Sequence, residues 1–254
     1  MTATGSEPTI DDRLIERRED VPATLPAGDY VVVDTLYFSN TVIELLAGGA
    51  AHVHVPPEDE PATAYRETDP RALVGGEPTD DLEPAEGHDF FNSPTDVQRL
   101  DVADRPVSVT STNGGRTLST LRARGGEDVE VFVGAPSNAA ALGTHLRERE
   151  RPTTLVGAGS EGAVALEDTV GAILVGRAVD GVSVSAAERA VFRRQIETVV
   201  DEASLAEHEV RRSDVSSYAT NFDARATVPK LEDGVLVDVG DADAPASVPA
   251  RTAT

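Results

Sequence analysis

The chain has 254 residues, of which 39% are hydrophobic and 4% aromatic, and it contains no cysteine. This length fits one large α/β domain, and the lack of cysteine excludes disulfides, thiolate metal sites and a cysteine nucleophile. Acidic residues outnumber basic ones by 45 to 22, which gives a formal net charge of −23. A charge of this sign repels nucleic acid and anionic membranes, so we expect neither as a partner.

The acidic composition also bears on habitat and location. Lys230 is the one lysine, and an acidic chain almost without lysine resembles the proteins of salt-loving microbes, in which salt screens the self-repulsion. We therefore expect a salt-loving archaeon as the source. No apolar run is long enough to cross a membrane, and the polar residues 1–20 lack the apolar core of a signal peptide, so we expect a cytoplasmic protein.

The ends of the chain are expected to differ from its middle. Residues 1–10 and the acidic tail 241–254 are polar and poor in large apolar side chains, which predicts disorder. The remaining residues 11–240 predict a single α/β domain. Self-association into a homo-oligomer stays open.

The first predicted elements place Asp34 at the end of a strand. Residues 29–34 form a short apolar run, followed by a helix capped at Ser39 or Asn40 and by a strand over 51–55. This is a β-α-β unit, and ligands of parallel sheets gather at the carboxyl ends of the strands. Residues 56–105 are rich in proline, glycine and acidic residues and predict an irregular excursion.

The second half of the chain continues the alternation. Strands are predicted at 107–110, 129–133 and 153–156, each leading through a polar loop towards a helix. Ser185 and Glu188 form a capping box at the start of a long helix, and residues 226–239 predict two strands around a turn. The order predicts an α/β fold, layered α/β/α with a mostly parallel or mixed sheet.

Four loops at strand ends are the candidate ligand-binding features. Residues 34–40, 110–116, 134–138 and 157–162 are rich in Gly, Ser, Thr or Asn, and N–H groups exposed at helix starts favour anions. Several acidic residues lie in or beside these loops and the excursion, namely Asp34, Glu77, Glu161, Glu167 and Asp168. Carboxylates with open water positions suit Mg²⁺, so the loops predict a phosphate or carboxylate ligand with a metal nearby.

Other readings of single motifs have weaker support. Residues 157–162 form G-A-G-S-E-G, a dinucleotide pattern, but Asp180 at the required distance ends a helical segment rather than a strand. His52 and His54 share one strand face and could bind a metal, although a polar strand face is the simpler interpretation. Ser160 does not lie in the G-x-S-x-G elbow of serine hydrolases.

A phosphoenzyme aspartate is a further reading that the sequence disfavours. Asp34 directly follows a strand, as such a nucleophile would, but Leu36 occupies the position where a second aspartate is expected.

Taken in order, five stretches resemble the 2-phosphosulfolactate phosphatase family, the enzymes of coenzyme M biosynthesis often called ComB. The stretch V-V-V-D-T-L-Y-F-S-N-T at 31–41 is similar to the family's V-V-I-D-V-L-R-A-T-T-T. The other four are G-E at 76–77 with N-S-P at 92–94, T-S-T-N-G-G-R at 110–116, G-A-P-S-N-A at 134–139, and A-G-S-E-G at 158–162 with L-E-D at 166–168. The resemblance runs from about residue 28 to 240.

The resemblance implies Mg²⁺-dependent hydrolysis of the phosphate ester of a small sulfonated acid, 2-phosphosulfolactate, to sulfolactate and phosphate. It makes catalytic candidates of Asp34, Glu77, Glu167 and Asp168, and the first three are also candidate metal ligands. The candidates for binding the substrate are Ser93, Asn113, Gly114, Arg116 and Gly159.

The chain departs from the family at two positions. Tyr37 and Pro78 stand where the family has arginines, and a hydrogen bond to a charged group contributes about 1.5–3 kcal/mol. Loss of two such cations favours an alternative, a relative that has shifted its substrate or binds an anionic metabolite without turnover. A third hypothesis is another enzyme class, such as a nucleotide-linked oxidoreductase.

Overall fold

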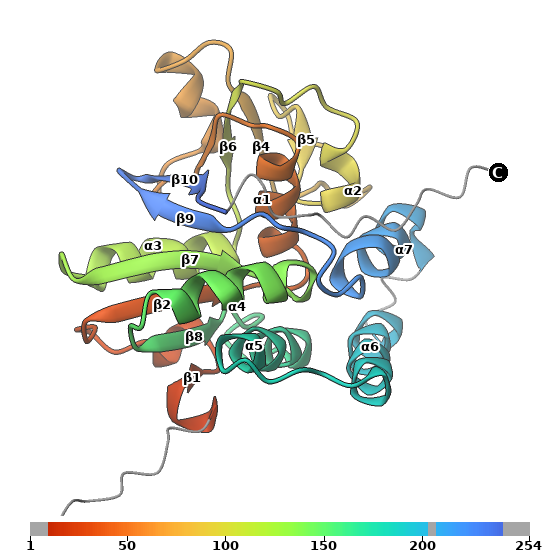
Figure 1. Cartoon of the computed structure of the whole chain (residues 1–254). Coiled ribbons are helices and arrows are strands. Elements are labelled where there is room, and N and C mark those ends of the chain that lie inside the picture. Colours follow the sequence, from red (N-terminus) through yellow and green to blue (C-terminus); the bar gives the residue numbers. More distant parts are fainter. Residues whose placement is uncertain (1–9, 203–206, 241–254) are drawn as a thin grey trace, which may run out of the picture.

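The computed structural model describes residues 10–202 and 207–240 (Figure 1). The termini that we expected to be disordered lie outside these residues, except that Ile10 begins the short helix η1 (Ile10–Arg13). The strands are β1 (Leu14–Ile15), β2 (Gly28–Val33), β3 (His52–His54), β4 (Leu73–Gly76), β5 (Phe90–Phe91), β6 (Pro106–Val109), β7 (Val129–Gly134), β8 (Thr153–Gly157), β9 (Pro229–Glu232) and β10 (Val235–Asp238). The α-helices are α1 (Phe38–Ala47), α2 (Pro94–Val97), α3 (Gly114–Arg124), α4 (Ala139–Glu148), α5 (Leu166–Val179), α6 (Ala186–Glu202) and α7 (Glu209–Asp214).

The ten strands form one mixed sheet in the order β1-β8-β2-β7-β9-β10-β3-β6-β4-β5. Within the sheet, one set of four neighbouring strands is mutually parallel: β1, β8, β2 and β7. A second parallel set consists of β3, β6, β4 and β5. Three successive antiparallel pairings through β9 and β10 join the two sets, so the sets run in opposite senses. The predicted α/β fold with a mostly parallel or mixed sheet is confirmed.

The predicted β-α-β unit is wrong in its pairing, because β2 and β3 are not neighbours. β7, β9 and β10 lie between them in the sheet. Consecutive strands are neighbours only about two-thirds of the time, and a hairpin inserted from the end of the chain leaves no trace in the local pattern of residues 28–55.

The segment 56–105, which we expected to be irregular, contains β4, β5 and α2. β4 pairs in parallel with β6 and β5 with β4, so the segment completes one edge of the sheet. These strands are short and β4 contains Gly75 and Gly76, which is why an apolar alternation is absent.

Helices cover both faces of the sheet, and the side chains of β2 alternate between two separate cores. Tyr30 and Val32 belong to a core with α1 and α3, whereas Val31 and Val33 belong to a core with α4, α5 and α6. Figure 1 shows α4 and α5 in front of β2, β7 and β8. This is the layered α/β/α arrangement.

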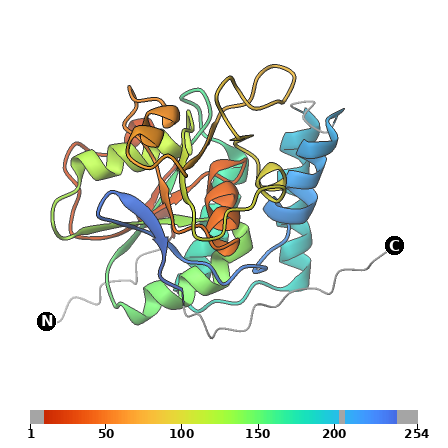
Figure 2. The same ribbon diagram turned by 90° about the horizontal axis from the view of Figure 1, so that it is seen from above.

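The predicted capping box at the start of α6 is confirmed. Ser185 Oγ accepts from the N–H of Glu188, while Glu188 Oε2 accepts from the N–H of Ser185. Beyond α6, Figures 1 and 2 show α7 at the same side of the molecule, where it also packs against α2. None of the helices in the described part of the chain has the length and apolar character needed to cross a bilayer.

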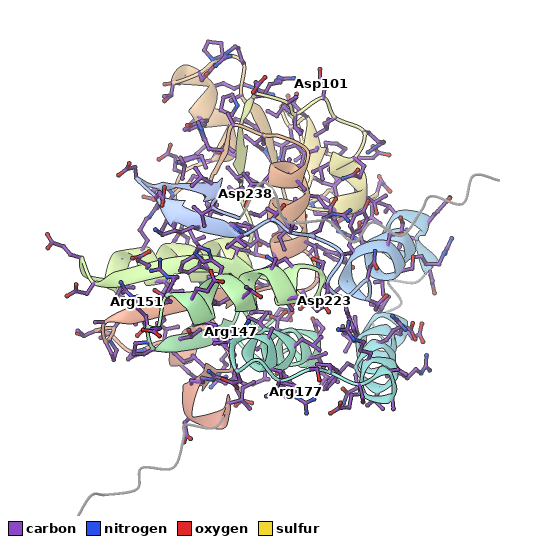
Figure 3. The ribbon with its side chains drawn as sticks, in the orientation of Figure 1. Asp101, Arg147, Arg151, Arg177, Asp223 and Asp238 are labelled. Atoms are coloured by element: carbon purple, nitrogen blue, oxygen red, sulfur yellow. The ribbon has the colours of Figure 1, made fainter. Side chains whose placement is uncertain are left out.

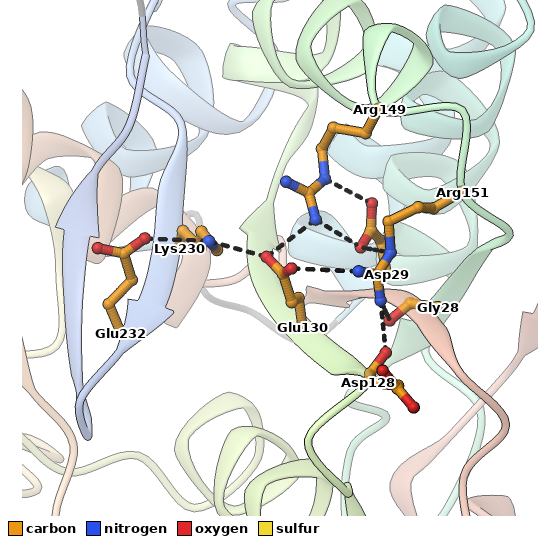
Figure 4. A network of polar contacts seen from close by, with 8 residues as sticks. All are labelled: Gly28, Asp29, Asp128, Glu130, Arg149, Arg151, Lys230 and Glu232. Carbon is orange, nitrogen blue, oxygen red and sulfur yellow. Dashed lines mark hydrogen bonds and ion pairs between the residues drawn. The ribbon is translucent and has the colours of Figure 1, made fainter.

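Charged side chains are spread over the molecule, and one group of them forms a connected network. In Figure 3, Asp101 and Arg177 lie at opposite ends of the molecule. At the start of β2, Asp29 is fully buried and accepts hydrogen bonds from Arg149 at 2.7 and 3.0 Å and pairs with Arg151 at 3.0 Å. Glu130 bridges these arginines to Lys230 (Figure 4).

Candidate active site

Asp34 is the first residue after β2, and the structure buries it against the start of α3. Its Oδ2 accepts from the N–H of Gly114 at 2.7 Å and its Oδ1 from the N–H of Phe38 at 3.4 Å. A β-carbon on Gly114 would lie 2.7 Å from Asp34 Oδ2. A glycine is therefore needed at 114 for α3 to approach the carboxylate this closely.

Asp168, in the first turn of α5, is the second buried carboxylate. Its Oδ1 accepts from the N–H of Thr35 at 2.8 Å, and its Oδ2 accepts from the N–H of Gly159 at 3.1 Å. Gly159 has a φ of +71°, a conformation that side chains disfavour. Thr35 also donates its hydroxyl to the carbonyl of Glu167, so the end of β2 is tied to the start of α5.

The four candidate loops meet although two opposed sets of strands supply them. The Gly114–Asp34 contact joins loops 110–116 and 34–40, and Asp168 joins 34–40 to 157–162. Ser137 Oγ donates to Asn40 Oδ1 at 2.6 Å and brings in the loop 134–138. Twist of about 20–25° per strand accumulates over the strands between β2 and β6, which turns the end of β6 towards the end of β2.

The electrostatics of this cluster favour retained protons. Burial is the main cause that raises the pKa of Asp34 to about 7, and the charges of Glu77 and Glu167 raise it further against two backbone hydrogen bonds. The pKa of Asp168 is raised well above its usual range by burial and by the charges of Asp34 and Glu167. Burial likewise raises the pKa of Glu167. A carboxyl that titrates near neutral pH can act as an acid or a base.

Glu77 and Arg116 lie at a neighbouring pocket of about 110 Å³ between the start of α3 and the loop after β3. Glu77 is exposed, and its Oε1 accepts from the N–H and hydroxyl of Thr112 at 2.8 and 3.0 Å. The Nε of Arg116 pairs with Glu58 at 3.1 Å, and both side chains are more than a third exposed. An incoming anion can replace such a pair, because exposed ion pairs are weak.

Several residues expected to bind substrate have other contacts. The N–H groups of Gly114 and Gly159 donate to Asp34 and Asp168, so these glycines position carboxylates. Ser93 is buried at the start of α2, where its hydroxyl donates to Asp214 at 2.7 Å and accepts from the N–H of Asp96. Asn113 precedes α3, half-buried, and its carbonyl accepts from Thr117.

The glycine loop 157–162 is a tight turn at the edge of this cluster. Ser160 and Ala163 pair across it as an isolated bridge, and the Gly162 carbonyl accepts from Arg17. Asp180 lies just beyond α5 and pairs with Arg13, away from any strand end that a dinucleotide ribose would require.

The two histidines on β3 have polar neighbours within the fold. His52 Nε2 lies 2.9 Å from the hydroxyl of Tyr65, and His54 Nδ1 lies 3.1 Å from Ser108 Oγ. Burial lowers the pKa of His54 to about 4.

Sequence reasoning missed a cationic side chain that reaches the site from a distant helix. The guanidinium of Arg211, on α7, lies 3.8 Å from the centre of the Tyr37 ring. Arg211 also bonds to the carbonyl of Asn92 and to Asp214, both at 3.1 Å. The Arg211–Asp214 pair at i,i+3 was the only available signal, and it indicates a helix rather than a site.

The described carboxylates of the site do not form a ready-made metal cage. Within residues 10–202 and 207–240, no group of three or more His, Asp or Glu side chains is arranged to hold a metal ion. Both oxygens of Asp34 and of Asp168 already accept backbone hydrogen bonds. The carboxylates therefore fit an ion such as Mg²⁺, which takes one or two protein carboxylates plus water and substrate oxygens, but not a cage built from protein alone.

Fold and site together define an α/β protein with a cluster of buried carboxylates at the loops that follow its strands. Comparison with known proteins identifies the group to which it belongs. Residues 15–234 match the family model of 2-phosphosulpholactate phosphatase, so the chain belongs to this family of phosphoric monoester hydrolases.

Individual relatives carry the same name. The chain is 34% identical over 188 residues to a probable 2-phosphosulfolactate phosphatase of Symbiobacterium thermophilum, an alignment that covers 70% of this chain and 78% of the relative. A protein of that name from Deinococcus radiodurans is 36% identical over 143 residues, covering 56% and 58% of the two chains. One from Thermotoga petrophila is 27% identical over 221 residues, covering 82% and 90%.

Proposed function

We propose that this protein is a Mg²⁺-dependent phosphatase that hydrolyses the phosphate ester of a small sulfonated or carboxylated acid, with 2-phosphosulfolactate as the substrate. The observation that carries the proposal is the buried cluster of Asp34, Glu167 and Asp168 at the meeting point of four loops, in a chain of this family.

Asp34 is the proposed acid–base group. With a pKa of about 7, its carboxyl can accept a proton from an attacking water or donate one to a leaving oxygen at neutral pH. Asp168 ties the loop after β2 to the loop after β8 through Thr35 and Gly159, and the nearby charge of Asp34 is one of the causes that raise the pKa of Asp168. Glu167 supplies a third carboxylate, which lies near the other two.

Arg116 is the proposed cation for the phosphate group. Its guanidinium lines the same pocket as Glu77, Thr112 and Ser111, and an arginine fork matches phosphate oxygens. Asn113, at the start of α3, is the proposed polar partner of the substrate. Ser93 supports this region from further away through Asp214.

Asp34, Glu77 and Glu167 are the residues from which we propose that one or two bind Mg²⁺ directly, with water and substrate oxygens as its other ligands. When bound, the ion would neutralise charge on the phosphoryl group and lower the pKa of a bound water. The mutual repulsion that raises the pKa of Asp34 is relieved by a divalent cation, which supports this assignment.

A second candidate is binding of an anionic metabolite without turnover. Tyr37 and Pro78, which replace the two arginines of the resembling motifs, favour this reading.

The two candidates separate in one assay. Phosphate release is measured with 2-phosphosulfolactate and other small phosphate esters, in molar KCl, with Mg²⁺ or with EDTA. Asp34→Asn should lower kcat by about 10²- to 10⁴-fold, the usual contribution of a general acid or base. Asp101→Asn is the control of equal charge, because Asp101 is exposed and lies at the far end of the molecule.

Release that requires Mg²⁺ and disappears in Asp34→Asn alone supports the phosphatase. A folded protein that releases phosphate from no ester, yet binds sulfolactate, would favour the second candidate.

A further inference from the structure

Tyr37 presents a buried donor beside the carboxylate cluster. Its hydroxyl is buried and has no hydrogen-bond partner among the described residues. Burial is the main cause that raises its pKa to about 12, with Arg211 acting in the opposite direction and the charges of Asp214, Glu167 and Asp34 adding to the rise. The hydroxyl therefore keeps its proton at neutral pH, and it lies within electrostatic range of Asp34 and Glu167.

Arg211 presents a second buried donor at the same place. Its side chain is 5% exposed, and its Nη1 is fixed by the Asn92 carbonyl and by Asp214. Its Nε has no partner in the part of the chain that the structure describes. Buried polar atoms nearly always have a partner, so an unsatisfied N–H on a fixed guanidinium calls for an explanation.

The residues around the Arg211 guanidinium fix its position but leave its Nε without a hydrogen-bond partner among the described residues. It lies 3.8 Å from the centre of the Tyr37 ring and 5.3 Å from that of Phe91, and a stacked guanidinium keeps its N–H groups directed outward in its own plane. Asp214 is itself fixed by Ser93 and by the N–H of Thr95. The arginine is therefore preorganised before any ligand arrives.

We propose that the Tyr37 hydroxyl and the Arg211 Nε bind the acid group of the substrate, a sulfonate or a carboxylate, while its phosphate ester lies at Asp34. This acid-group subsite rests on the proposed function and makes the pair the residues that determine specificity. An oxyacid anion can accept hydrogen bonds from orphaned donors of this kind, which neither a cation nor an apolar group can do. The positive charge comes from α7, whereas residue 37 contributes only a neutral donor.

The test compares three esters that differ in their acid groups: 2-phosphosulfolactate, 2-phospholactate and isopropyl phosphate. The quantity measured is the ratio of kcat/KM between esters with and without a given acid group. Arg211→Gln should reduce this ratio about 10- to 100-fold, since it removes a hydrogen bond to a charged group. Tyr37→Phe keeps the ring and the stack and should reduce it about 3- to 10-fold.

Arg212→Gln is the matched control. It makes the same change of charge one residue along α7, where the side chain is exposed, and should leave the ratio within twofold. Thermal unfolding of each variant identifies any that fails to fold. Tyr37→Phe then carries the test if Arg211→Gln does not fold.

The outcomes separate this proposal from the phosphatase itself. A fall in the ratio of 2-phosphosulfolactate to 2-phospholactate supports a sulfonate subsite, and a fall in the ratio of 2-phospholactate to isopropyl phosphate supports a carboxylate subsite. Unchanged ratios in folded, active Arg211→Gln and Tyr37→Phe would overturn the subsite and leave the phosphatase intact. If the parent protein hydrolyses none of the esters, calorimetry with sulfolactate decides. Binding that Arg211→Gln abolishes supports the subsite without the phosphatase, and binding that it does not weaken overturns the subsite.

Discussion

Strand β2 has a buried aspartate at each end, and the fold treats the two in opposite ways. Asp29, at the start, is fully buried and is met by the guanidinium groups of Arg149 and Arg151. Asp34, just past the end, is 3% exposed and lies among Glu77, Glu167 and Asp168. The same residue type on the same strand is compensated at one end and left among like charges at the other.

The two environments suit different roles, a structural one for Asp29 and a chemical one for Asp34. A buried carboxylate with two arginines is fixed in position by its ion pairs, and its hydrogen bond to Arg149 is the main cause that raises the pKa of that arginine. A buried carboxylate among like charges changes its protonation near neutral pH and attracts a cation. Enzymes often accept lower stability in exchange for such a site.

The strongest test of the comparison replaces each aspartate by asparagine and measures the free energy of unfolding at pH 8 in EDTA. Asp29→Asn should destabilise the protein by about 3 kcal/mol, the lower end for breaking a buried ion pair, because both arginine heads remain partly in water. Asp34→Asn should stabilise it by about 1–2 kcal/mol, because it removes a charge that burial and neighbouring carboxylates disfavour.

Urea denaturation checks both values, and kcat/KM per folded molecule of Asp29→Asn should match that of the parent. If both variants lose stability equally, the charge environment does not distinguish the two ends of β2.

A second test uses pH. Asp34 has a pKa of about 7 in the folded protein, above the ordinary value near 4, so the folded state binds the proton more tightly than the unfolded state. The free energy of unfolding should therefore fall as pH rises from about 4 to 7, by on the order of 1–3 kcal/mol, and level off above 7. Asp168 and Glu167 act in the same direction.

Equilibrium unfolding between pH 4 and 8 in EDTA measures this slope, which Asp34→Asn should make shallower. A profile identical in the variant and the parent would show that Asp34 ionises normally.

The smallest expected effect concerns the ion pairs of Asp29 at the start of β2. Arg151 pairs with Asp29 at 3.0 Å and with Glu130 at 3.2 Å, and also donates to the carbonyl of Asp128. Arg151→Lys keeps the charge but loses the planar set of guanidinium N–H donors, so it should lower the free energy of unfolding by about 1 kcal/mol. The shift in the urea midpoint at constant m value measures this cost, and Arg194→Lys, a change on an exposed part of α6, should leave it unmoved.

The sequence predicted the elements whose signals are local. The apolar runs of β2, β7 and β8, the capping box at Ser185 and the hairpin around residues 232–234 each depend on residues a few positions apart. β4 and β5 could not be predicted in this way, because both strands are short and depend on partners elsewhere in the chain. β4, which contains Gly75 and Gly76, pairs with β6, and β5 pairs with β4.

The residues of the candidate site also differ in whether a local sequence signal could identify them. Asp34, Glu167 and Asp168 were selected from short motifs and lie together in the structure. The stacking of Arg211 on Tyr37 and the bond from Ser93 to Asp214 join segments far apart in the chain. No spacing rule connects such segments, so only the fold reveals them.

The position of the β9–β10 hairpin has a consequence for how the protein is made. The two parallel sets hydrogen-bond to each other through this hairpin, and its residues follow those of all the other strands in the sequence. The contact of Asp34 with Gly114 joins the two sets, so a nascent chain has synthesised both partners long before the strands that fix their relative position. Contacts so distant in sequence slow folding, and we expect the carboxylate cluster to be completed only after the hairpin has brought the two sets together.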